Sequence, residues 1–168
     1  MGVKSAAIAL WSLRNARKQP LAWAFLGASA LVVPLSHSMS PFTLGGLDQA
    51  WSLARQWSSL FAMLGGSLAL AFLSHHEAFL RLVAPRTRWC GEWSTLLLAG
   101  VLLQCPQALA AFALSDSLEG IGEWCFSSLA SALLIACAGL IALRISAAGS
   151  TRVIWLWVFL WGIPGLLG

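Results

Sequence analysis

Charged residues are scarce in this chain. Only 10% of its 168 residues are charged, whereas about 25% is usual in a soluble domain. Hydrophobic residues make up 59%, which leaves too little polar surface for a chain of this size to stay in solution. The scarcity of charge therefore excludes an ordinary soluble domain. It predicts an integral membrane protein in which residues 1–168 form a single membrane domain.

Signature motifs of catalysis and metal binding are also missing. The patterns G-x-x-x-x-G-K-[ST], G-x-S-x-G and H-E-x-x-H do not occur, so the chain has no recognisable nucleotide-hydrolysing or hydrolase site of its own. The four cysteines form no C-x-x-C pair and predict neither a disulfide framework nor a zinc site. His75 and His76 would point about 100° apart on a helix, and His37 lies at the far end of another apolar run. We expect no enzyme activity, no cofactor and no metal site.

Five apolar runs are long enough, or nearly long enough, to cross a membrane as a helix of about 20 residues. They cover approximately residues 21–37, 57–74, 94–114, 125–143 and 153–168. The last run is short and would rise only about 24 Å, so it either spans thinly or re-enters at Pro164. The predicted fold class is all-α, a polytopic membrane bundle of about five transmembrane helices. An N-terminal interfacial helix over residues 1–19 and a short helix between the second and third runs are also predicted.

None of the five runs contains Asp, Glu, Lys or Arg. Ion-coupled carriers usually need an intramembrane charge, so a self-sufficient ion pump is disfavoured. The most polar stretch inside a run is 104–107, where Gln104 and Gln107 share a helix face. That face lines a substrate path or makes hydrogen bonds between helices, and the sequence leaves both interpretations open. Pro106 predicts a kink because it cannot donate to the carbonyl of Leu102.

The fourth run carries small residues at a spacing of four, in the pairs Ser127 with Ser131 and Ala132 with Ala136. Small residues at this spacing allow two helix backbones to approach closely inside a membrane. We therefore expect this face of the fourth helix to be a packing surface.

The basic residues indicate the orientation in the membrane. With five spans, only Arg55 falls on one side, and the other nine lie on the opposite side. These nine are Lys4, Arg14, Arg17, Lys18, Arg81, Arg86, Arg88, Arg144 and Arg152. The positive-inside rule makes their side cytoplasmic, with the N-terminus inside and the C-terminus outside. Topology thus accounts for the net charge of +4 better than nucleic-acid binding does, and we expect the lipid bilayer, not a nucleic acid, as a partner.

The segment between the second and third runs has a distinctive order of residues. An acidic Glu77 precedes Leu80 and Leu82, and Pro85 and the basic stretch 86–88 follow. This order resembles the ABC-2 family of transporter permeases, including the haem-exporter type, and the resemblance covers roughly residues 1 to 145. It implies that this loop is a coupling helix that sits in a cleft of a separate ATPase subunit. The residues implied to dock are Glu77, Leu80, Arg81, Val83, Arg86 and Arg88. Leu80 and Val83, three residues apart, are the expected anchors, and Pro85 is expected to end any helix that begins at Glu77.

Two hypotheses of function follow. The first is a permease subunit of an ATP-driven exporter in a bacterial inner membrane, which works with an ATP-binding subunit and with a second permease copy or homologue. The second is a structural or assembly subunit of a larger membrane complex, with no transport path of its own. Members of the family usually have six spans, whereas five runs are found here. The sequence does not indicate the substrate.

Overall fold

The computed structural model describes residues 3–42, 44–114, 118–145 and 148–167. Helices account for 92% of the structure, and the described residues contain no strand, which confirms the all-α class. The elements in chain order are α1 (Val3–Ala16), α2 (Pro20–Ser38), η1 (Ser40–Phe42), α3 (Gly46–His75), α4 (Glu77–Leu80), α5 (Pro85–Leu114), α6 (Leu118–Ile145) and α7 (Gly149–Leu167).

Four helices are long and apolar enough to cross a membrane, as expected for an integral membrane protein. They are α2, α3, α5 and, over Ile121–Ile145, α6. The fifth apolar run forms α7, and its crossing of the membrane stays a prediction. The first four runs therefore coincide with helices, and only their ends differ from the predicted bounds.

Two of these helices are longer than their apolar runs. α3 begins at Gly46 and α5 begins at Pro85, whereas the runs begin at Trp57 and Ser94. A helix of 30 residues is about 45 Å long, which exceeds a hydrocarbon core of about 30 Å. The added turns of α5 carry charged residues, so the apolar run identifies the part of the helix suited to lipid and not the whole helix.

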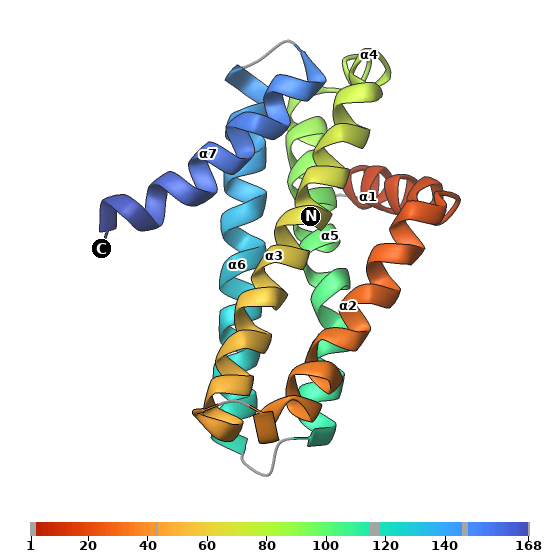
Figure 1. Ribbon diagram of the computed structural model, residues 1–168. Helices are drawn as coiled ribbons and strands as arrows, with labels where there is room; N and C mark the ends of the chain where they lie inside the picture. Colours follow the sequence, from red (N-terminus) through yellow and green to blue (C-terminus); the bar gives the residue numbers. More distant parts are fainter. Residues whose placement is uncertain (1–2, 43, 115–117, 146–147, 168) are drawn as a thin grey trace.

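The long helices lie side by side along one axis (Figure 1). α4, the start of α5, the end of α6 and the start of α7 gather at one end, which we call the α4 end. η1, the start of α3, the end of α5 and the start of α6 form the other end, the η1 end. α1 crosses the bundle nearer the α4 end, and α7 runs from that end away from the other helices (Figure 1).

The predicted interfacial segment is a helix that packs on α5. α1 buries Ile8, Ala9 and Ser12, and Leu10 on its other side is 64% exposed. The close approach depends on Gly91, because a Cβ there would lie 2.7 Å from the Cδ1 atom of Ile8. α1 therefore has one face on protein and one face free for the membrane surface.

Small residues hold α5 and α6 close together. Ala132 and Ala136 of the predicted packing face are fully buried, and a Cβ on Gly100 would lie 3.2 Å from the Cβ of Ala132. Ser131 is half-buried and Ser127 is exposed. The close part of the contact thus begins about one turn further along α6 than its first predicted residue.

The first half of α7 is held against the bundle. Leu156 is fully buried, and the indole Nε1 of Trp157 donates a hydrogen bond of 2.9 Å to the Oγ of Ser67 in α3. Further along α7, Trp161 is 64% exposed, in agreement with the divergence of this helix in Figure 1.

Candidate functional site

A buried carboxylate stands at the centre of the α4 end. Glu92 of α5 is 1% exposed, and each of its two oxygens accepts a hydrogen bond from an arginine. Arg88 Nε lies 2.6 Å from Oε1, and Arg144 Nη2 of α6 lies 2.7 Å from Oε2. The Arg144 guanidinium also stacks on Trp89, 4.5 Å from the ring centroid. Burial of a charge is costly unless it is paired in this way. The bond from Arg144 also links α6 to Glu92 of α5.

A second carboxylate extends the cluster to α4 and α7. Arg152 Nη2 of α7 lies 2.7 Å from Glu77 Oε2, and Arg81 Nη2 lies 3.1 Å from Glu77 Oε1. Arg88 also approaches Glu77 Oε1, at 3.7 Å, so it lies between the two glutamates. Arg152 is only 3% exposed. We call Glu77, Arg81, Arg88, Glu92, Arg144 and Arg152 the arginine cluster.

The electrostatics of Glu77 follow from these contacts. Partial burial raises the pKa of its carboxyl, but hydrogen bonds from Arg152 and Arg81, together with their charges, outweigh burial. The net effect is a pKa below the ordinary value of 4.5. Glu77 is therefore ionised near neutral pH. The two glutamates and four arginines leave the arginine cluster with an excess of positive charge.

The residues predicted to dock an ATPase fall into two groups. Arg81 is 68% exposed at its side chain and Arg86 is exposed, and nothing in the described part of the chain pairs with Arg86. In contrast, Leu80 is 1% exposed and belongs to the main hydrophobic core, against which Val83 packs. Leu82, 85% exposed, is a large apolar residue that this segment presents outward.

These positions revise the predicted anchors. Leu80 and Val83 were expected to face a partner together because they are three residues apart. The helix that would present them ends at Leu80, so the spacing that applies inside a helix does not extend to Val83. That helix ends before Pro85, as predicted, and Pro85 is itself the first residue of α5, where its missing N–H is tolerated. Arg81, Leu82 and Arg86 form the exposed surface here, which we call the α4–α5 turn.

A second cluster lies inside the bundle, nearer the η1 end. Gln104 of α5 donates from Nε2 to Ser131 Oγ of α6 at 2.8 Å, and Gln107, one turn further along, is fully buried. Ser58 of α3 and Trp124 of α6 are also buried nearby. We call these residues the amide cluster. The face that the sequence singled out on α5 therefore points into protein and not into lipid.

Most polar atoms of the amide cluster lack a partner. Within the described residues, nothing bonds to Ser58 Oγ, Gln104 Oε1, Trp124 Nε1, or either polar atom of the Gln107 amide. A buried group without a partner costs about 1–3 kcal/mol. The space beside Ser58, Gln104 and Trp124 is small and only partly enclosed. Of the two polar atoms of the Gln104 amide, only Nε2 has a partner, the Oγ of Ser131.

Three residues of the arginine cluster were not singled out from the sequence as site residues. Glu92, Arg144 and Arg152 lie at the ends of apolar runs, where charges are expected on topological grounds alone. The spacing of four residues between Glu77 and Arg81, and again between Arg88 and Glu92, was an available signal for pairing. Nothing in the sequence indicated that α6 and α7 would complete the cluster. The chain matches no family model, no curated protein and no solved structure.

Proposed function

We propose that this chain is the membrane-spanning permease subunit of an ATP-driven exporter of the ABC-2 type, and that a separate ATPase docks on its α4–α5 turn. The order of Glu77, Leu80, Leu82 and Pro85 suggested this function, and the geometry around it supplies the main support. The exposed turn is not an isolated loop, because its neighbours Glu77 and Arg88 belong to a cluster of ion pairs that reaches α6 and α7.

That connection is the observation that carries the proposal. Glu77 contacts α5 through Arg88 and α7 through Arg152, and Glu92 contacts α6 through Arg144. A partner that moves the turn would therefore displace the ends of three long helices together. Buried, hydrogen-bonded ion pairs transmit such a displacement better than flexible surface contacts do, since each separated charge would be left unpaired.

The proposal includes an orientation, in which the α4 end faces the cytoplasm of a bacterial cell. Arg86 and the arginine cluster lie at this end. Arg55 lies toward the other end, paired with Glu123 at 3.4 Å. This asymmetry supports a cytoplasmic α4 end under the positive-inside rule. Cysteines introduced at Arg86 and at Leu44, in a background without native cysteines, would test it. Labelling of the Leu44 position from the cytoplasm would reverse the assignment.

In the same proposal, the amide cluster is a section of the substrate path that is closed in this conformation. Within the described residues, most of its polar atoms are buried without partners, an arrangement that is unfavourable unless another conformation satisfies them. Separation of α5 from α6 would expose Gln104 and Gln107 to a polar substrate or to water. A second copy of the chain, expected in this type of exporter, would enclose the opened path.

The docking surface can be tested with two leucines that are both exposed. Leu82 of the α4–α5 turn is 85% exposed and Leu44, near η1, is fully exposed. Neither Leu82→Ala nor Leu44→Ala should affect folding. We expect Leu82→Ala combined with Arg86→Glu to reduce recovery of an ATP-binding protein from native membranes about tenfold or more. Leu44→Ala should leave recovery unchanged.

Two results would count against the permease. If the wild-type chain recovers its other membrane partners but no ATP-binding protein, the proposal fails and the structural-subunit hypothesis takes its place. If an ATP-binding protein is recovered equally by the wild type and by the double variant, docking occurs elsewhere and the α4–α5 turn is not the coupling surface. Leu80→Ala is unsuitable for this test because it would remove a core residue.

A further inference from the structure

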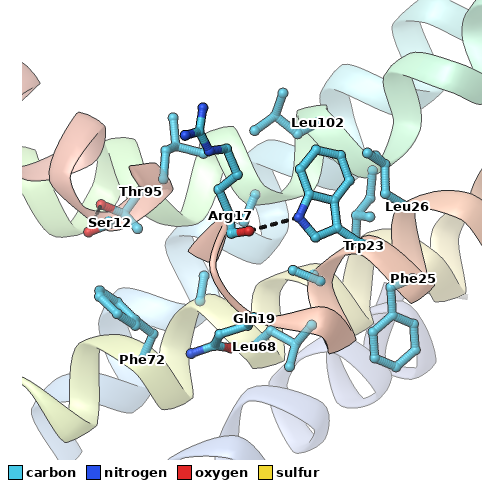
Figure 2. Close-up of a pocket in the computed structure, with 16 residues that line it drawn as sticks. Ser12, Arg17, Gln19, Trp23, Phe25, Leu26, Leu68, Phe72, Thr95 and Leu102 are labelled. Atoms are coloured by element: carbon cyan, nitrogen blue, oxygen red, sulfur yellow. Dashed lines mark hydrogen bonds between the residues drawn. The ribbon is translucent and has the colours of Figure 1, made fainter. Parts of the chain in front are cut away.

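A cavity of about 370 Å³ lies between the α1–α2 corner and the pair α3 and α5 (Figure 2). Its volume falls within the range of about 300–1,000 Å³ that is usual for small-molecule sites. Aromatic and aliphatic side chains form most of its wall, among them Trp23, Phe25, Leu68, Phe72 and Leu102. The cavity is open at one side, and it belongs to neither the arginine cluster nor the amide cluster.

The polar residues of the wall are Ser12 of α1, Arg17 and Gln19 of the α1–α2 corner, and Thr95 of α5. Ser12 and Thr95 are already satisfied, by the carbonyl oxygens of Ile8 and Gly91 at 2.9 and 2.8 Å. Arg17 is different, because its side chain is exposed and no described residue pairs with its guanidinium. The Arg17 carbonyl oxygen accepts a hydrogen bond of 2.7 Å from Trp23 Nε1 (Figure 2). This bond holds the backbone of Arg17 against the indole at the edge of the cavity.

The cavity thus has an apolar body and a cation at its edge. Lys18 follows Arg17 and is also exposed, which adds a second positive charge at the same corner. A peptide would fit poorly, since its backbone amides would find few free donors or acceptors in this wall. A hydrocarbon chain needs none, and an anionic group attached to it would meet Arg17, whose guanidinium geometry suits phosphate oxygens.

We propose that this cavity binds one acyl chain of an anionic phospholipid, with the lipid phosphate against Arg17. The helices on either side of it, α2, α3 and α5, are long and apolar enough to cross a membrane, so the cavity is accessible to the lipid around the bundle. α1, which packs on α5 with one face open, places the Arg17 corner where headgroups would lie. The proposal does not depend on transport and would hold for a structural subunit as well.

The test is lipid retention by the purified full-length chain, measured by native mass spectrometry. The probes are phosphatidylglycerol and phosphatidylcholine with the same acyl chains, added separately. We expect the wild type to retain phosphatidylglycerol about tenfold better, the size of effect that a hydrogen bond to a charged group produces. Arg17→Glu should abolish that preference. Arg14→Glu is the matched control, since Arg14 is also exposed, in the last turn of α1, but does not line the cavity.

A variant that fills the cavity tests the proposal independently of Arg17. Ala22 lines the cavity, so Ala22→Phe should reduce retention of both lipids, whereas Ala28→Phe, at an exposed position of α2, should not. Equal retention of the two lipids by the wild type, or equal effects of Arg17→Glu and Arg14→Glu, would overturn the proposal. It would also be overturned if Ala22→Phe left lipid retention intact and instead dissociated a dimer, because a second copy would then occupy the cavity.

Discussion

The two ends of the bundle differ in how their buried polar groups are paired. At the α4 end, two glutamates and four arginines form a continuous set of ion pairs, and Glu92 is only 1% exposed. Toward the η1 end, Arg55 and Glu123 pair at the surface with side chains 45% and 73% exposed. Uncharged amide and hydroxyl groups lie buried behind them without partners. Paired buried charges favour a rigid α4 end, whereas unpaired buried amides favour a conformational change toward the η1 end.

The largest expected effect comes from removing the centre of the arginine cluster. Glu92→Gln leaves Arg88 and Arg144 without their carboxylate, and breaking a buried ion pair costs about 3 kcal/mol. The matched variant at the other end, Glu123→Gln, should cost less than about 1 kcal/mol because that pair is exposed. Chemical unfolding in detergent micelles measures both changes. Equal losses for the two variants would remove the contrast between the ends.

The second effect concerns glycines. Gly91→Ala places a Cβ 2.7 Å from Cδ1 and 2.8 Å from Cβ of Ile8, so α1 must shift, at a cost of about 1–3 kcal/mol. Gly122, in α6 near the η1 end, has open space around it. Gly122→Ala should therefore be neutral or stabilising by up to about 1 kcal/mol through helix propensity. Thermal unfolding measures the change in stability for both variants. A stabilised Gly91→Ala chain would show that α1 does not pack closely on α5.

The third effect is a gain of stability. Gln107→Leu removes two buried polar atoms that lack partners, and we expect it to stabilise the chain by about 1 kcal/mol. Gln56→Leu, at an exposed position of α3, serves as the control and should not stabilise. If the permease proposal is right, Gln107→Leu also lowers export while it raises stability. Destabilisation by Gln107→Leu would mean that the amide has partners after all.

The smallest expected effect is a pH dependence at the α4 end. The pKa of Glu77 is lowered in the folded chain, so its stabilising contribution is complete above its ordinary pKa of 4.5 and is lost as the pH falls further. The difference in apparent melting temperature between the wild type and Glu77→Gln should therefore be greatest near neutral pH and shrink on acidification. A difference that stays constant from about pH 7 to about pH 3 would exclude a role for ionised Glu77.

The sequence predicted the helices better than the contacts between them. Apolar runs located the four long helices because helix length and lipid thickness are linked. They did not indicate that α3 and α5 begin about three turns earlier, since apolarity does not mark the end of a helix outside lipid. Pro85 illustrates the same limit, because a proline that ends one helix equally well begins the next.

The candidate site was predicted only where local spacing decides the contact. Spacing placed Gln104 and Gln107 on one face, and both are buried. It also placed Leu80 and Val83 on one face of a helix that in fact stops at Leu80. The partners of Glu92 and Glu77 on α6 and α7 come from residues 52 and 75 positions later in the chain. Such pairings depend on how helices pack, which composition and periodicity do not report.

The distance in sequence between Glu77 and Arg152 has a consequence for biosynthesis. During synthesis the glutamate emerges well before the arginine, which belongs to α7. Until then Glu77 lacks the buried guanidinium that lies 2.7 Å away in the folded chain. A nascent chain that has inserted only its first four long helices therefore holds an incompletely paired charge at the α4 end. Addition of α7 removes this defect, so assembly of the arginine cluster would distinguish chains that contain α7 from chains that stop before it.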